Sequence, residues 1–164
     1  DLMKTEDATE ATGTIAYATR NPQTRLLAAK EWYVGAGGND LLWGGTKEGS
    51  VKTVYDPCPA GYRVPDARHF AEMKFTSKAE CDANYGMLLA VNGEDTKSYF
   101  PTTGYLEANK NITMYLEYRG YMWLNAGGTT AHNRFYVNNT SANIDKTIET
   151  HAKGMAVRCV KTEQ

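Results

Sequence analysis

Short apolar runs separated by glycine, asparagine, aspartate and proline fill the second half of the chain. Runs of this length, bounded by turn-forming residues, are typical of β-strands. We therefore expect strands over residues 87–91, 99–100, 105–106, 112–118, 121–124, 134–137 and 155–160.

The beginning of the chain shows a weaker pattern. Residues 1–13 are polar and have no periodicity, which predicts a linker or a frayed lead-in. Residues 14–29 start with β-forming residues, are interrupted by Asn21-Pro22, and then become apolar again. This arrangement predicts a strand, a turn and a second strand.

Helical periodicity is strongest over residues 66–74, where apolar side chains recur at helical spacing. Pro65 precedes this segment, and a proline is well tolerated at the first position of a helix. A second helical piece is expected over residues 77–83, where Ser77 and Glu80 have the spacing of a capping box.

Residues 54–65 form a rigid connector that leads into the helix predicted over residues 66–74. They contain three prolines, which exclude a continuous helix, and Cys58 lies between the first two. Gly61 allows a turn, and residues 62–64 then predict a short strand. The whole pattern predicts an α+β fold of mostly short antiparallel strands, with one or two helices in the first half and long loops in the second.

Composition restricts the class of protein. The chain has 164 residues, of which 41% are hydrophobic and 23% charged, as expected for one globular domain. The formal net charge of −1 argues against nucleic acid as the main partner. No apolar run reaches the roughly 20 residues of a membrane-spanning helix.

Three cysteines, Cys58, Cys81 and Cys159, leave several arrangements open. In an oxidising compartment, one disulfide and one free thiol is the simplest solution. A bridge from Cys58 to Cys159 would close a long loop, and one from Cys58 to Cys81 a much shorter one. In a reducing compartment all three would be buried thiols. The spacings do not match those of a zinc site.

Residues suited to catalysis or cofactor binding do not gather in the sequence. The histidines, His69, His132 and His151, are scattered, and no paired-histidine motif is present. The acidic residues are spread evenly, and no serine stands in a nucleophile motif. We therefore expect no catalytic residues, no metal site and no cofactor, and hence a protein that is not an enzyme.

Residues 120–141 are the strongest candidate for a binding segment. They combine tyrosine, tryptophan, asparagine and glycine as binding loops do, because rigid aromatic rings and directed amides can hold a ligand together. The alternative is a simple hairpin with a glycine-rich tip. The candidate ligand-binding residues are Tyr121, Trp123, Asn125, His132, Asn133, Tyr136 and Asn138.

The connector and several later segments together resemble a known family. Residues 55–65, followed by a predicted helix, are similar to the opening signature of the major paralogous domain. This domain occurs in surface lipoproteins and fimbrillin-like proteins of gut anaerobic bacteria. Residues 154–160 resemble its closing strand. Weaker similarities lie at residues 20–22, 31–33, 42–44, 99–105 and 120–123.

The resemblance implies a single C-type-lectin-like domain over residues 14–164. In that fold the terminal strands pair, which would bring Cys58 close to Cys159 and allow a disulfide between them. The calcium-dependent lectins of this fold use a proline turn that this chain lacks, so no calcium site is carried over. The formylglycine-forming enzymes of the same fold have a reactive cysteine arrangement without an evident counterpart here.

The resemblance also implies a role. We expect a non-enzymatic adhesion module at the cell surface or outer membrane, in the tip or adhesive domain of a fimbrial protein. It would bind a glycan or protein on a host or neighbouring cell, with pilus subunits as further partners, and have no direct membrane span. Two alternatives are a structural pilus subunit or spacer without a soluble ligand, and a diversified ligand-binding receptor.

Overall fold

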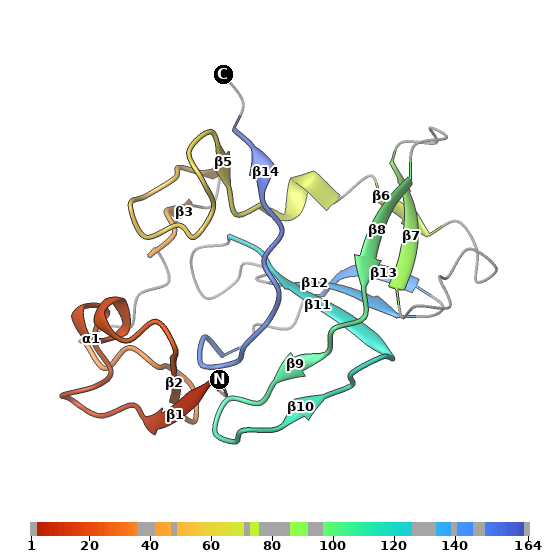
Figure 1. The fold of residues 1–164 in the computed structure, drawn as a ribbon. Coiled ribbons are helices and arrows are strands. Elements are labelled where there is room, and N and C mark those ends of the chain that lie inside the picture. The colour runs from red at the N-terminus through yellow and green to blue at the C-terminus, as the bar shows by residue number, and fades with distance from the viewer. Residues whose placement is uncertain are drawn as a thin grey trace. The chain divides into compact units, whose positions relative to one another are not determined.

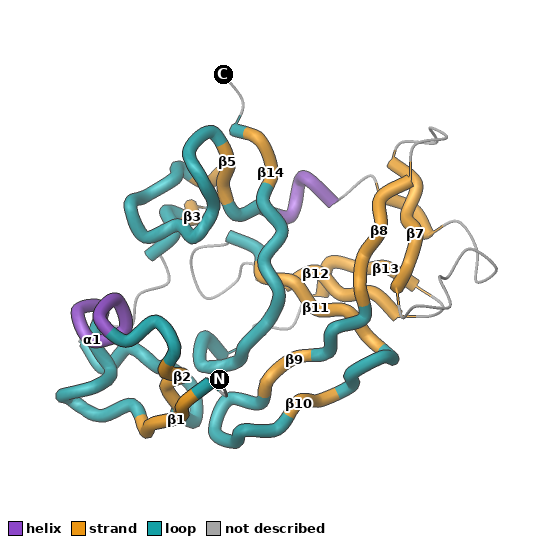
Figure 2. The backbone as a smooth tube through the Cα atoms, in the orientation of Figure 1, coloured by secondary structure: helices purple, strands orange, loops and turns teal. Residues whose placement is uncertain are grey.

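The computed structural model describes residues 3–35, 42–46, 49–70, 73–75, 86–91, 97–125, 134–138, 141–145 and 150–162. Within these residues the chain forms short strands, one α-helix and one 3-10 helix, joined by long stretches without regular structure (Figure 2). The chain divides into two compact units. The first comprises Asp1–Asn39, Leu106–Met114 and Glu149–Gly154, and the second comprises Asp40–Tyr105, Tyr115–Ile148 and Met155–Gln164.

The first unit contains a parallel pair of strands, β1 (Lys4–Asp7) and β2 (Thr24–Leu27), with helix α1 (Ile15–Arg20) between them in the chain. Backbone hydrogen bonds tie its three chain segments together. The Ala28 N–H donates to the Ala108 carbonyl (3.1 Å), and the Ala152 N–H donates to the Lys30 carbonyl (3.1 Å).

Two expectations for this part of the chain need correction. Residues 1–13 are not wholly a linker or frayed lead-in, because Lys4–Asp7 pairs along its length with β2. The first of the two strands expected over residues 14–29 is helix α1. The Thr14 hydroxyl accepts a hydrogen bond from the Tyr17 N–H (3.1 Å) and caps the helix, and α1 contains two alanines.

The second unit contains two three-stranded antiparallel sheets. One has the order β6–β7–β8, with strands Met73–Phe75, Gly86–Val91 and Lys97–Pro101. The other has the order β11–β12–β13, with strands Arg119–Trp123, Arg134–Asn138 and Ser141–Asp145 (Figure 1). Two short pairs also lie in this unit, β3 (Gly45–Thr46) with β4 (Gly49–Ser50) and β5 (Tyr62–Arg63) with β14 (Val160–Lys161). A further short pair is β9 (Tyr105–Leu106) with β10 (Thr113–Met114), of which β10 and Leu106 belong to the first unit.

The expectation of mostly short antiparallel strands with little helix is confirmed, with differences in detail. The strand expected over residues 112–118 is restricted to Thr113–Met114, and that over 155–160 to an isolated bridge at Ala156 and the start of β14. The helix expected over residues 66–74 is wrong. A 3-10 helix covers only Ala67–Phe70, because Met73–Phe75 pairs with β7. The second helical piece, over 77–83, lies outside the described residues.

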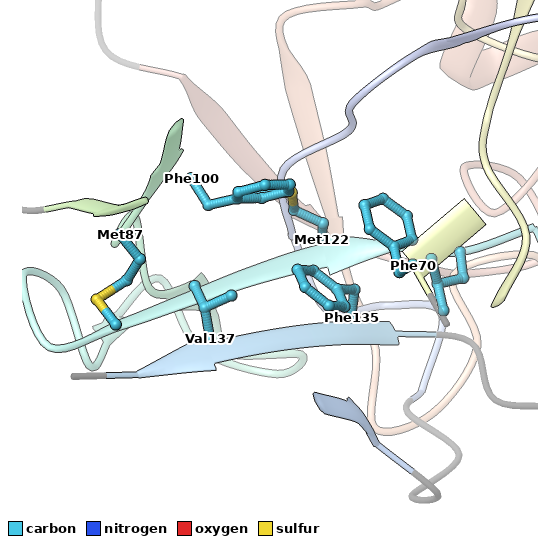
Figure 3. Close-up of a cluster of buried hydrophobic side chains, with 7 residues drawn as sticks. Phe70, Met87, Phe100, Met122, Phe135 and Val137 are labelled. Carbon is cyan, nitrogen blue, oxygen red and sulfur yellow. The ribbon is translucent and has the colours of Figure 1, made fainter. Parts of the chain in front are cut away.

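The core of the second unit lies against one face of β11 and β12. Side chains from the 3-10 helix and from strands β7, β8, β11 and β12 converge on one buried cluster (Figure 3). Phe135 is 1% exposed and stacks on Phe70, with the ring centroids 4.4 Å apart. The cluster consists of Phe70, Met87, Phe100, Met122, Leu124, Phe135 and Val137.

Gly120 allows β11 to approach its neighbours closely. A Cβ atom at this position would lie 2.6 Å from the Pro101 carbonyl oxygen and 2.7 Å from Val137 Cγ2. Contacts this short are excluded by steric repulsion, so a glycine is required where β11 passes β8.

A disulfide and a pair of strands join the connector to the end of the chain. Cys58 is bonded to Cys159, with their Cα atoms 5.7 Å apart. β14 follows Cys159 directly, and β5 follows Cys58 after a short turn; the two strands pair antiparallel, with Val160 opposite Arg63 (Figure 1). Gly61, at φ +77°, makes the turn that leads into β5. The disulfide that the family resemblance implied is therefore present, and Cys81 lies outside the described residues.

Two buried aspartates hold the connector in place. The Asp56 carboxylate accepts hydrogen bonds from the backbone N–H groups of Cys58 (2.8 Å) and Val64 (3.0 Å). Asp66 lies between Arg63 (3.4 Å) and Arg68 (2.8 Å) and contacts His69 Nδ1 at 3.0 Å. Burial acts to raise the pKa of Asp66, but the hydrogen bonds from Arg68 and the nearby positive charges outweigh it and lower the pKa to about 2.

This lowered pKa predicts a specific loss of stability in acid. The pKa of Asp66 lies below its ordinary value of 3.8, so the carboxylate stabilises the fold above about pH 4. That stabilisation, of about 2 kcal/mol, is expected to disappear as the pH falls from about 4 to about 2. Urea unfolding over this range should show a steeper loss for the wild-type chain than for Asp66→Asn. Parallel curves for the two proteins would contradict the assignment.

Candidate binding surface

The pairing of β11 with β12 separates their side chains into two faces. Residues opposite one another in an antiparallel pair project to the same side, and successive residues alternate. Met122 lies opposite Phe135, and both belong to the core cluster. Gly120 and Val137 lie on this core side as well, so the other face carries Arg119, Tyr121, Trp123, Arg134, Tyr136 and Asn138.

Four tyrosine rings lie together on this second face. Tyr121 is at the centre, with ring centroids 5.0 Å from Tyr105, 6.4 Å from Tyr115 and 5.3 Å from Tyr136. Tyr105 and Tyr121 are buried, Tyr136 is half-buried, and Tyr115 is 43% exposed. The buried pair thus supports two rings that reach solvent. We call Tyr115, Arg119, Tyr136 and Asn138 the tyrosine–arginine face.

Arg119 stacks on the exposed tyrosines. Its guanidinium carbon lies 4.2 Å from the centre of the Tyr115 ring and 5.8 Å from that of Tyr136. Its Nη1 donates a long hydrogen bond of 3.5 Å to the Tyr121 hydroxyl. This hydrogen bond raises the pKa of Arg119 against the opposing effect of burial. The cation is therefore held in one orientation by aromatic rings.

The turn before β11 contributes further exposed groups. Tyr115 and Glu117 have positive φ angles of 55° and 69°, which are uncommon for residues other than glycine. The Tyr115 carbonyl accepts hydrogen bonds from the N–H groups of Tyr118 (3.2 Å) and Arg119 (3.1 Å). Strained backbone that is fixed in this way is often found at binding sites. On the same turn, Leu116 is 53% and Tyr118 73% exposed.

The residues proposed from sequence divide into four groups, the last of which is Asn125 alone. Tyr136 and Asn138 lie on the tyrosine–arginine face, and the Asn138 amide donates to the Tyr136 hydroxyl. Tyr121 and Trp123 lie on the same side of the sheet but are only 3% and 7% exposed, so they support the surface. His132 and Asn133 lie outside the described residues.

Asn125 has a structural environment. It is 3% exposed, its amide donates to the Trp43 carbonyl (2.8 Å), and its N–H donates to the Pro65 carbonyl (2.7 Å). A side chain tied to the backbone in this way connects segments of the fold and has little surface left for a ligand.

Sequence reasoning did not identify Tyr115 or Arg119 as candidates. Tyr115 lies within the strand expected over residues 112–118, and Arg119 lies between that strand and the one expected over residues 121–124. The signal that was available is the alternation itself, because Arg119 has the same parity as Tyr121 and Trp123 along β11. The positive φ of Tyr115 has no sequence signal of comparable strength, since its residue type gives no reason to expect it.

A second feature lies entirely in the first unit. A hollow of about 300 Å³ is lined by apolar groups that include Trp32, Leu26 and Leu106. At its rim His151 contacts Glu31, with 2.8 Å between Nδ1 and Oε2. Arg25, also in the lining, donates to the Lys110 carbonyl (2.9 Å) and thereby stabilises the fold. The hollow thus offers mainly apolar contact.

Two other features are absent from the part of the chain that the structure describes. There, no group of three or more histidine, cysteine, aspartate or glutamate side chains is placed to hold a metal ion. No helix within the same residues has the length and apolar character needed to cross a membrane. No family model, curated protein or solved structure matches this chain. The tyrosine–arginine face therefore has to be interpreted from its own chemistry.

Proposed function

We propose that this chain is a non-enzymatic binding module at a bacterial cell surface and that it holds its ligand on the tyrosine–arginine face. The observation that carries the proposal is the division of β11 and β12 into a core face and a face of tyrosine, arginine and asparagine. Aromatic rings, a guanidinium and an amide together provide flat apolar contact and directed hydrogen bonds, which ligand recognition requires.

We propose further that the second unit has a C-type-lectin-like topology, as in the major paralogous domain. The Cys58–Cys159 bridge and the adjacent pairing of β5 with β14 support this proposal, because that topology brings the two terminal strands together. A disulfide also fits an oxidising compartment outside the cytosol. The role that follows is adhesion, in the tip or adhesive domain of a fimbrillin-like protein, to a glycan or protein on a host or neighbouring cell.

The segment between β11 and β12 is part of the binding segment expected from the sequence. It contains His132 and Asn133, whose contribution to binding stays a prediction from sequence. Because Trp123 and Arg134 are the paired residues at which the two strands end, the segment begins and ends beside the sheet. A ligand on the tyrosine–arginine face would lie on two of the strands that carry this segment.

A binding screen with matched tyrosine variants tests the proposal. The purified chain is applied to a glycan array and to a panel of extracellular matrix proteins. Tyr136→Ala is expected to weaken binding about tenfold or more, since aromatic residues at the centre of an interface often contribute more than 1 kcal/mol. Tyr62→Ala removes another exposed tyrosine, 44% exposed on β5, and should leave binding unchanged.

Three outcomes would count against the proposal. Binding that both variants retain would remove the site assignment. An absence of binding to every probe, together with ordered polymers of the purified chain, would favour the structural pilus subunit. Turnover of a bound probe would contradict a non-enzymatic role.

A further inference from the structure

The chemistry around Arg119 narrows the ligand class, on the basis of the proposed function. We infer that the tyrosine–arginine face recognises a sugar that carries a carboxylate, with the acid group on Arg119 and the sugar ring against the Tyr115 ring.

Arg119 has donors to offer. A guanidinium has five N–H donors, and the one hydrogen bond that the Arg119 guanidinium makes among the described residues is the long contact to the Tyr121 hydroxyl. It forms no ion pair with any carboxylate in that part of the chain. Two other arginines of the second unit are differently placed. Arg63 contacts Asp66 at 3.4 Å, and Arg158 donates to the Tyr99 carbonyl at 2.6 Å.

Stacking prepares Arg119 for a planar anion. The guanidinium carbon lies 4.2 Å from the centre of the Tyr115 ring, and the N–H groups of a guanidinium all lie in its own plane. A carboxylate accepts two such N–H groups side by side, in the bidentate arrangement that gives strong and specific pairing. Because the side chain is already fixed by aromatic contacts, little conformational entropy is lost when the anion binds.

The neighbouring groups suit a sugar. The exposed Tyr115 ring offers a flat apolar surface next to the cation, and sugar rings have an apolar face of similar size. Asn138 and Tyr136 add an amide and a hydroxyl that can bind to sugar hydroxyl groups.

The backbone argues against an extended acidic peptide. Peptides of that kind commonly add a strand to an open sheet edge. The outer edge of β11 is already used, because the Gly104 N–H donates to the Arg119 carbonyl (2.7 Å) and the Trp123 N–H donates to the Ala156 carbonyl (2.9 Å). Recognition on this face therefore depends on side chains, which favours a compact ligand.

The test uses pairs of sugars that differ only in charge. Trigalacturonate, a glucuronate-terminated disaccharide and sialyllactose are each titrated into the full chain by calorimetry, beside the corresponding methyl esters. We expect at least one acid to bind and its ester to bind about tenfold more weakly or worse, since hydrogen bonds to charged groups contribute about 1.5–3 kcal/mol.

Variants of Arg119 complete the test. Arg119→Gln should lose about tenfold or more in affinity for the acid and little for the ester. Arg119→Lys keeps the charge without the planar fork and should show an intermediate loss. Arg20→Gln removes the same charge from an exposed position on α1 and should have no effect. Thermal unfolding of each variant establishes that it is folded.

The possible results separate this inference from the proposed function. One result would contradict the ligand class alone: neutral sugars or an acidic hexapeptide bind, and no acid sugar is preferred. If Tyr136→Ala removes that binding, the tyrosine–arginine face is still the binding face. If acids and esters bind equally, the ligand class is also wrong. If no probe binds to the folded wild-type chain, the inference fails, and an empty array and protein screen would then remove the proposed function as well.

Discussion

Replacing both Cys58 and Cys159 with serine is expected to lower the free energy of unfolding by roughly 4–5 kcal/mol. The two cysteines are 101 positions apart, so the bridge closes a long loop in the unfolded chain. In the chain-entropy description, a closed loop of this length restricts the unfolded ensemble strongly and thereby stabilises the folded state. An effect of this size is comparable to the whole stability of many small domains.

The strands beside the bridge cannot compensate for its loss. The pair of β5 and β14 consists of only two residues on each strand. Once the sulfur link is removed, a pair this short has few interactions to offset the entropy of ordering the end of the chain. We therefore expect the last residues to separate from β5 before the core unfolds.

Denaturation with urea, with and without a reducing agent, measures this effect. Wild-type protein in the presence of reductant should resemble the double serine variant, and the variant itself should not respond to reductant. Equal midpoints for the oxidised wild type and the variant would show that the bridge contributes nothing. Such a result would also remove the main support for the lectin-like topology proposed above.

Phe135→Ala is expected to destabilise the second unit by about 3–5 kcal/mol. Phe135 is 1% exposed, and its ring lies 4.4 Å from Phe70 and 5.4 Å from Phe100. Removing it eliminates both aromatic contacts and leaves a cavity that the surrounding sheets cannot fill completely. The cost therefore includes the lost burial of the ring and the empty volume.

Two variants serve as controls for the core prediction. Phe135→Leu keeps most of the volume and should cost clearly less. Tyr118→Ala removes a side chain that is 73% exposed and should change stability by less than about 0.5 kcal/mol. Thermal or urea unfolding gives all three values. A loss for Phe135→Ala no larger than that for Tyr118→Ala would show that the cluster is not the core.

The two predictions also separate stability from binding. Phe135 and Tyr136 are neighbours in β12, yet the alternation of the strand places one in the core and the other on the tyrosine–arginine face. A change at Phe135 should reduce binding only as far as it unfolds the protein. A change at Tyr136 should reduce binding in a protein that is still folded.

Local patterns in the sequence were sufficient for much of the strand assignment. Residues 87–91, 121–124 and 134–137 are short apolar segments between turn residues, and each overlaps a strand of the structure. The prolines and glycine of the connector likewise fixed a turn and a short strand, since their backbone preferences act within a few residues. The disulfide was expected because the connector and the last strand resemble one family.

Contacts between distant segments overrode the local pattern elsewhere. Helical spacing over residues 66–74 was real, but pairing of Met73–Phe75 with β7 ended the helix after one turn. Asn125 resembles a binding residue in sequence, and its environment is set by the Trp43 carbonyl, 82 positions away. Propensity is a weak prior where such long-range contacts compete with it.

By itself, the sequence determined several of the short strands and the connector turn, because alternation and the restricted backbone of proline and glycine act over a few neighbouring residues. Only the tertiary structure decided that Tyr105, Tyr115, Tyr121 and Tyr136 form one cluster and that Arg119 stacks on two of them. These residues come from β9, a turn, β11 and β12, and their distances depend on how those elements pack. A linear pattern does not contain that information.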